Sequence, residues 1–166
     1  MTDSGAFESL AEFAIALAGF TSVVVVFSRR DGELHPADRF RIRAALVSSL
    51  GAAFLALVPV GLELTGLPSS AVWRASSLVL VAAVAWDSIH TEVRRRRLSP
   101  NARSVLSSRI SGFLRALRLF SFVAGLLNAT GVLFAPQPGA YFFAVLCALL
   151  YGAIAFARMV FVRPAA

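Results

Sequence analysis

The feature that most constrains the fold is a series of five long apolar blocks. A helix advances about 1.5 Å per residue, so about 20 apolar residues are needed to cross a hydrocarbon core ~30 Å thick. The blocks that reach this length are residues 7–27, 44–67, 71–89, 116–135 and 139–162. The sequence therefore predicts an all-α integral membrane protein with five transmembrane helices, folded as a single transmembrane domain over residues 1–166.

The first block lies in "AEFAIALAGFTSVVVVFSRR", residues 11–30, where a removable signal would be found. A secretory signal has a basic segment before its apolar core. Here the core follows the acidic segment "MTDSGAFE", and the arginines come after it. We therefore expect a retained helix whose N-terminus lies outside the cytoplasm.

The remaining blocks form two pairs with short connections. The second and third are joined by "TGLPSS", and the fourth and fifth by "APQPG". Both connections are rich in residues that favour turns. We expect two helical hairpins, which together with helix 1 make up the five spans.

Arginine supplies all of the basic charge, because the 16 basic residues include no lysine, and the net charge is +7. With the N-terminus outside, every arginine except Arg74 falls on the cytoplasmic side, so the predicted topology is N-out and C-in. These arginines flank apolar blocks, which favours anionic lipid headgroups as partners and no nucleic acid. The wealth of alanine, valine and arginine without lysine is typical of bacterial chains of high genomic G+C. We therefore predict a multi-pass protein of the bacterial inner membrane.

The segment over residues 99–115 separates the third block from the fourth. At helical spacing its apolar residues gather on one face and its serines on another, which predicts a cytoplasmic interfacial amphipathic helix between these spans. The apolar face comprises Ala102, Leu106, Ile110, Phe113 and Leu117. The arginines predicted to bind lipid are Arg94, Arg95, Arg96, Arg97, Arg103 and Arg109. A simpler interpretation of the first four is an anchor that only fixes the topology.

The first block carries a graded stripe about 100° wide, from carboxylates at its outer end, through small and apolar residues, to an arginine. The stripe consists of Glu8, Glu12, Ile15, Gly19, Ser22, Val26 and Arg30. The bulky residues on the opposite face are Phe13, Leu17, Phe20 and Val24. Around an axis shared by several copies, the stripe would form a pore whose carboxylates attract cations and whose apolar middle gates by dewetting. Alternatively, the stripe packs against another helix.

A second candidate is the pair Asp87 and His90 in "WDSIHTE", at the cytoplasmic end of the third block. Their i, i+3 spacing places both on one helix face, where they could pass a proton or bind an ion. A simpler interpretation pairs Asp87 with an arginine, for which the candidates are Arg41, Arg43 and Arg94. Because too few ligands have a recognisable spacing, no metal site is predicted.

Three further features have structural explanations. Glu63 and Arg74 flank the first hairpin near its outer end, so we expect an ion pair across the turn. Pro59 should bend the second helix, either as a fixed bend that neighbouring side chains fill or as a hinge for gating. Asn128 should bond to an adjacent helix.

The sequence has no nucleophile placed with a base, no phosphate-binding glycine loop and no facing pair of catalytic carboxylates. We therefore expect neither an enzyme nor a cofactor. The leading hypothesis is a small homo-oligomeric ion channel, cation-conducting and lined by helix 1. One alternative is a non-conducting subunit or scaffold that binds a partner membrane protein and anionic lipid. The other is a membrane-permeabilising effector.

Overall fold

The computed structural model describes residues 3–28, 36–97, 108–133 and 135–161, and every regular element in them is a helix. The helices are α1 (Asp3–Ser28), α2 (Pro36–Glu63), α3 (Ser69–Arg97), α5 (Ser108–Thr130) and α6 (Pro138–Phe161). All five are long and apolar enough to cross a membrane. By length and composition, the chain is therefore a multi-pass membrane protein, as the apolar blocks predict.

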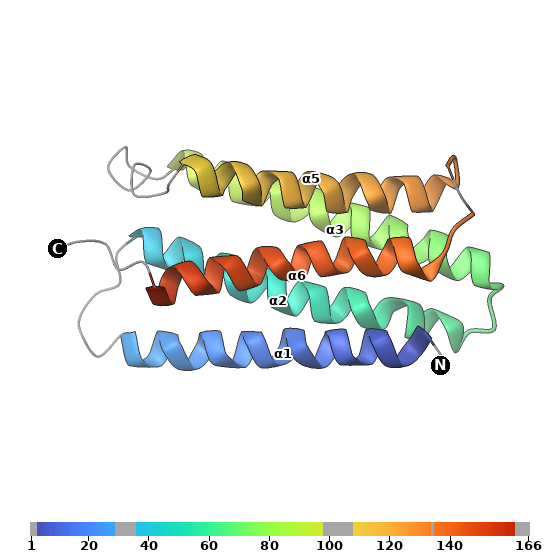
Figure 1. Cartoon of the computed structure of the whole chain (residues 1–166), viewed down its shortest axis with the longest axis horizontal. Coiled ribbons are helices and arrows are strands. Elements are labelled where there is room, and N and C mark those ends of the chain that lie inside the picture. The colour runs from blue at the N-terminus through green and yellow to red at the C-terminus, as the bar shows by residue number, and fades with distance from the viewer. Residues whose placement is uncertain (1–2, 29–35, 98–107, 134, 162–166) are drawn as a thin grey trace.

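The five helices lie side by side along the long axis of the molecule (Figure 1). One end of the bundle, the turn end, holds the start of α1 and the connections from α2 to α3 and from α5 to α6. At the opposite end, the basic end, α3 finishes with the run Arg94–Arg97. Successive helices run in opposite directions, so α1, α3 and α6 all run from the turn end to the basic end.

Glycines allow α2 and α5 to end at the turn end. Gly66 has a φ of 75° and its amide donates to the Glu63 carbonyl at 3.1 Å. Gly131 has a φ of 70° and its amide donates to the Leu127 carbonyl at 3.0 Å. A side chain disfavours this left-handed conformation, so glycine is the residue that commonly follows a helix in it.

α5 begins and ends earlier in the chain than the apolar block 116–135 that predicts it. Residues 108–115 of the predicted amphipathic segment form the first two turns of α5, and residues 99–107 lie outside the described residues. The interfacial position of this segment therefore stays a prediction.

α6 is the central element, because it contacts all four other helices. α2 packs mainly on α1 and α6, whereas α3 packs mainly on α5. α2 and α3 are consecutive in the chain but share a smaller contact. The bundle therefore consists of one group formed by α1, α2 and α6 and a second group in which α3 and α5 pack together beside α6.

Two glycines allow the closest helix packing within these groups. A Cβ atom at Gly125 of α5 would lie 2.7 Å from Leu80 Cδ2 on α3. A Cβ atom at Gly152 of α6 would lie 3.0 Å from Ser49 Oγ on α2. Small residues allow helices to approach in this way, and dispersion forces then stabilise the contact.

Aromatic side chains fill the core at the turn end. The ring of Phe7 on α1 lies 5.7 Å from Trp73 on α3 and 5.9 Å from Tyr141 on α6, and Trp73 lies 6.0 Å from Tyr141. These centroid distances are typical of favourable aromatic pairs. The cluster ties α1 and α3 to the central helix.

Tyr141 also repairs a break in the backbone of α2. Pro59 has no N–H, so the carbonyl four residues earlier, at Leu55, lacks its helical donor. The buried Tyr141 hydroxyl donates to this Leu55 carbonyl at 2.6 Å. A side chain of a neighbouring helix thus satisfies the acceptor that Pro59 leaves without a donor.

Asn128 supplies a second polar link at the turn end, as the sequence predicts. Its Nδ2 atom donates to Ser77 Oγ on α3 at 2.9 Å, and its Oδ1 atom accepts from the backbone amide of Gln137 at 3.0 Å. One buried amide therefore connects α5, α3 and the segment that enters α6.

Candidate functional site

The graded stripe of α1 faces away from the bundle. The face of α1 that is buried in the bundle consists of Phe7, Leu10, Ala11, Ala14, Leu17, Ala18 and Thr21. Every described member of the stripe is exposed: Glu8, Glu12, Ile15, Gly19, Ser22 and Val26. Arg30 lies outside the described residues. The stripe is therefore available to water, lipid or another protein surface.

The bulky face expected opposite the stripe is divided in the structure. Leu17 is buried in the bundle, whereas Phe13 and Phe20 are exposed. At 100° per residue, the stripe is centred roughly 130° from the buried face on one side, and the two phenylalanines lie roughly 100° from it on the other. The exposed surface of α1 thus has an aromatic side suited to lipid and a separate side that carries the carboxylates.

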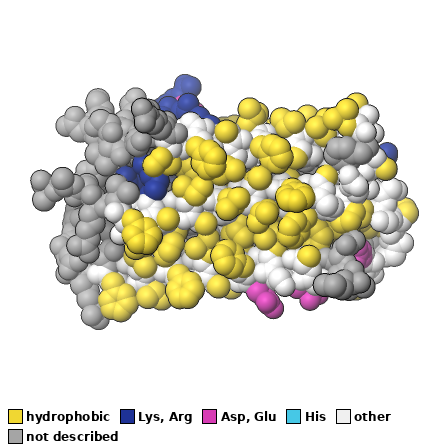
Figure 2. Space-filling view, viewed as in Figure 1, with side chains coloured by type: hydrophobic (Ala, Val, Ile, Leu, Met, Phe, Trp, Pro, Cys, Tyr) yellow, Lys and Arg dark blue, Asp and Glu magenta, His cyan; other side chains and the backbone are white. Residues whose placement is uncertain are grey.

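The acidic and basic groups of the chain lie at different places. Figure 2 shows acidic side chains along the edge formed by α1 towards its N-terminal end, and basic side chains gathered at the basic end beside α3 and α5. Within the described residues, no ion pair involves Glu8 or Glu12. In the middle of the stripe, the Ser22 hydroxyl donates to the Ala18 carbonyl of its own helix at 3.0 Å.

The predicted ion pair between Glu63 and Arg74 is absent from the described part of the chain. Both side chains are exposed at the turn end, and neither takes part in a salt bridge there. The turn between α2 and α3 is held by backbone hydrogen bonds instead.

Asp87 and His90 have different partners in the structure. Asp87 Oδ2 accepts a hydrogen bond from Nη2 of Arg118 on α5, and the two side chains form an ion pair. The His90 ring lies 4.2 Å from the Trp86 ring at a tilt of 33°, and its Nδ1 atom lies 3.0 Å from the Trp86 carbonyl oxygen. Asp87 is therefore paired with an arginine, as the simpler interpretation holds, but the arginine is none of the three expected.

Arg118 is a central residue of the candidate site that sequence reasoning missed. Its Nη2 atom also donates to Thr91 Oγ1 at 3.3 Å, and its Cζ atom lies 3.9 Å from the centre of the Tyr151 ring. Arg118 thereby joins α3, α5 and α6 through an ion pair, a hydrogen bond and a cation–π contact. The available signal was its position in "FLRALRLF", well inside an apolar helix.

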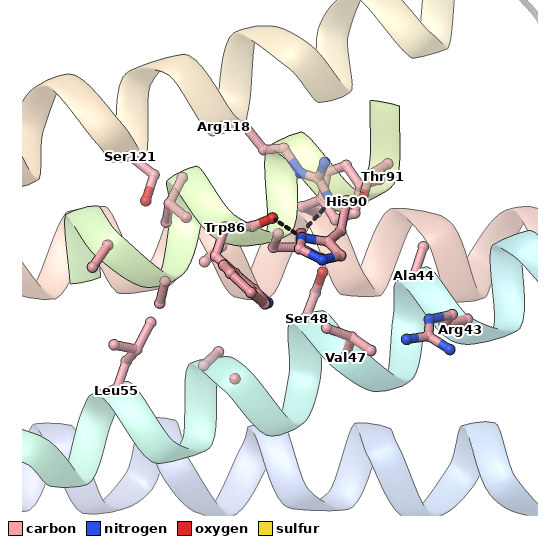
Figure 3. A pocket seen from close by; sticks show the side chains of 18 of the residues that line it. Arg43, Ala44, Val47, Ser48, Leu55, Trp86, His90, Thr91, Arg118 and Ser121 are labelled. Carbon is pink, nitrogen blue, oxygen red and sulfur yellow. Dashed lines mark hydrogen bonds and ion pairs between the residues drawn. The ribbon is translucent and has the colours of Figure 1, made fainter. Parts of the chain in front are cut away.

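A cavity of about 530 Å³, the α2–α3 cleft, lies where α2 and α3 diverge. Figure 3 shows Trp86 and His90 of α3 facing Val47 and Ser48 of α2 across it, with Arg118 behind them. Its wall towards the turn end is apolar and includes Leu55. At its other end the charged lining residues are Arg43, Asp87, Arg94 and Arg118.

A second cavity of about 460 Å³, the α3–α5 cleft, lies on the other side of Arg118. Its apolar walls include Ile89 of α3 and Leu119 of α5. Its charged lining residues are Glu92, Arg95, Arg115, Arg118 and Arg158. Arg118 and Tyr151 line both clefts, so their contact forms part of the partition between them.

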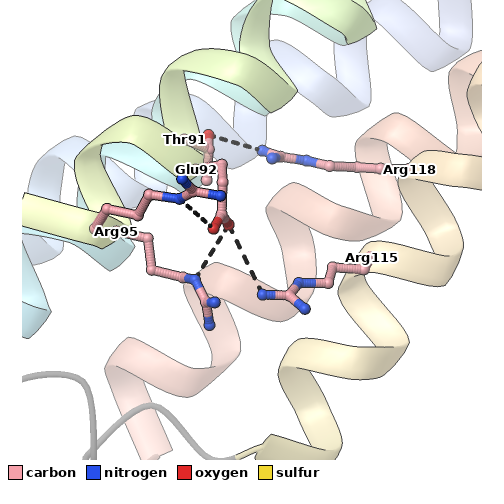
Figure 4. Close-up of polar contacts among 6 residues, drawn as sticks. Thr91, Glu92, Arg95, Arg115 and Arg118 are labelled. Carbon is pink, nitrogen blue, oxygen red and sulfur yellow. Dashed lines mark hydrogen bonds and ion pairs between the residues drawn. The ribbon is translucent and has the colours of Figure 1, made fainter.

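One carboxylate forms ion pairs with several arginines at the rim of the α3–α5 cleft. Glu92 pairs with Arg95 and Arg96 at 3.2 Å each and with Arg115 at 3.7 Å. Figure 4 shows its carboxylate between Arg95 and Arg115. These side chains are largely exposed, so the pairs themselves contribute little stability. They nevertheless leave positive charge in excess around the cleft.

The arginines that the sequence assigns to lipid are distributed over both clefts. Arg94 lines the α2–α3 cleft and Arg95 the α3–α5 cleft, while Arg97 is exposed. Arg109 belongs to the first turn of α5, and Arg103 lies outside the described residues. In the described ranges, no group of three His, Cys, Asp or Glu side chains converges as a metal ion would require.

Comparison with models of protein families, with curated proteins and with solved structures gives no match. The features that indicate a function are therefore the α1 stripe and the two clefts.

Proposed function

We propose that the chain is the subunit of a homo-oligomeric membrane pore that conducts cations along the graded stripe of α1. The observation that carries this proposal is the exposure of Glu12 on a helix of spanning length. Glu12 lies nine residues after Asp3, about 14 Å along the helix axis. At that position a carboxylate facing lipid is costly, whereas a water-filled axis shared by several copies hydrates it.

The rest of the stripe fits the same arrangement. Glu8 lies one turn closer to the N-terminal end of α1 and would add a second ring of carboxylates that concentrates cations. Ile15 and Val26 would supply apolar rings, at which a narrow pore gates by dewetting. The aromatic side with Phe13 and Phe20 would remain against lipid.

Purified protein in liposomes should carry a cation flux that Glu12→Gln reduces by about tenfold, because the attraction of cations to the ring is lost. Glu63→Gln is the matched control, since Glu63 is also exposed at the turn end but belongs to α2. The control should leave the flux unchanged. A preparation that is monomeric in nanodiscs and carries no flux would contradict the pore.

The alternative function is a non-conducting subunit whose α1 stripe packs on a partner helix. The hydrogen bond from Ser22 to the Ala18 carbonyl favours it, because it leaves the middle of the stripe with no free polar donor. Gly19 is also open, because no atom of the other described helices lies within 4 Å of where a Cβ would be. An assembled protein with no more flux than empty liposomes would favour this alternative.

A further inference from the structure

Arg158 is a buried cation at the floor of the α3–α5 cleft. Its residue is 8% exposed, and its Nε atom is buried without a hydrogen-bond partner among the described residues. A guanidinium in this environment requires an acceptor, because a buried charge is stable only when it is paired and hydrogen-bonded.

The carboxylates near the cleft are already engaged. Glu92 pairs with three arginines, and Asp87 pairs with Arg118. The lining of the cleft has one carboxylate, that of Glu92, and four guanidinium groups. The four belong to Arg95, Arg115, Arg118 and Arg158. The cleft therefore has a net positive charge that matches an anionic ligand.

The shape of the cleft indicates what kind of anion fits. Besides the arginines, its lining includes Ala85, Ile89, Leu114, Leu119 and Phe122. Ile89 and Leu119 are mostly exposed, so this apolar lining extends to the outer surface of a membrane-spanning chain. A cavity with apolar walls and a basic floor fits an amphiphile that carries a phosphate group beside an acyl chain.

We propose that the α3–α5 cleft binds an anionic phospholipid, with Arg158 donating to the phosphate from the floor and Arg95 and Arg115 from the rim. The acyl chain lies along Ile89 and Leu119. Arginine suits this role because its planar group presents several N–H donors to phosphate oxygens at once. This site does not depend on the proposed pore, because it uses none of the residues of α1.

The test measures the thermal unfolding of the full chain in nanodiscs of phosphatidylcholine, alone or with phosphatidylglycerol added. For the parent, phosphatidylglycerol should raise Tm by about 5 °C or more at saturation, because a ligand of the folded state stabilises it. In Arg158→Gln most of this rise should vanish, and the apparent Kd for phosphatidylglycerol should increase about tenfold or more. The control Arg74→Gln changes an exposed arginine at the turn end and should keep the full rise.

Arg158→Lys provides a second variant that retains the charge without the planar fork. It should recover only part of the rise in Tm, so the test stands even if Arg158→Gln fails to fold. The assignment of the site is overturned if Arg158→Lys, or a folded Arg158→Gln, gains as much from phosphatidylglycerol as the parent does. The assignment to lipid is overturned if inorganic phosphate gives the same rise in phosphatidylcholine alone.

Discussion

The turn end and the basic end of the bundle differ in how their polar side chains are paired and how closely their helices pack. At the turn end Asn128 and the Tyr141 hydroxyl have matched partners on neighbouring helices, and aromatic rings fill the space between them. At the basic end arginines outnumber the carboxylates of the α3–α5 cleft, and two cavities separate the helices. The difference indicates that the turn end is packed to stabilise the fold, whereas the basic end contains open cavities and unbalanced positive charge.

The two tryptophans of α3 provide the strongest test of this comparison. Trp73→Ala should lower the free energy of unfolding by about 3–5 kcal/mol, because it leaves a cavity in the aromatic cluster. Trp73 is 4% exposed, whereas Trp86 at the α2–α3 cleft is 68% exposed. Trp86→Ala should therefore cost under about 1 kcal/mol. Circular dichroism during unfolding in detergent measures both, and equal losses would contradict the division between the ends.

The two tyrosines of α6 test the difference between the turn end and the basic end by removal of a single hydroxyl group. Tyr141→Phe removes the donor to the Leu55 carbonyl and should cost about 1–3 kcal/mol, because a buried acceptor is left unsatisfied. Tyr151→Phe keeps the ring that Arg118 contacts, and the Tyr151 hydroxyl has no hydrogen bond to the described residues, so the loss should be under about 0.5 kcal/mol. The same unfolding assay measures both variants. A larger loss of unfolding free energy for Tyr151→Phe than for Tyr141→Phe would show that the basic end contributes more to stability than the turn end.

The carboxylates of the basic end should have smaller effects than Trp73 and Tyr141. Asp87→Asn should cost about 1–2 kcal/mol, because it leaves the half-buried Arg118 without its anionic partner. Glu92→Gln should cost under about 1 kcal/mol, because its arginine partners are mainly exposed. Measured in phosphatidylcholine alone, a greater loss for Glu92→Gln would show that the rim contributes to the fold.

The sequence predicts the five helices well, because the length needed to cross a bilayer is a strong constraint on an apolar block. It predicts the stripe of α1 but not which other residues of that helix are buried. Leu17 and Phe20 are both apolar, and in lipid either can face outward. Helical periodicity therefore separates charged from apolar faces, but not buried apolar faces from those exposed to lipid.

Long-range pairs were less accessible to sequence reasoning. Arg41, Arg43 and Arg94 are near the basic end by topology, but the partner of Asp87 is Arg118, on the helix that packs against α3. The choice depends on which helices are neighbours, and no local pattern encodes it. For Arg158 the sequence indicates only a charge that fixes topology, because the burial of its side chain depends on the packing of α6 at the centre of the bundle.

The bond from Tyr141 to the Leu55 carbonyl has a mechanical consequence. It joins α2 to α6 near the turn end, and the close packing of Ser49 on Gly152 joins the same two helices again nearer the basic end. Two contacts along the helix resist rotation of α2 against α6, whereas a single contact would act as a pivot. The flexibility that proline would give an isolated helix is therefore restrained in this bundle, and the wall that α2 contributes to the α2–α3 cleft is held in place.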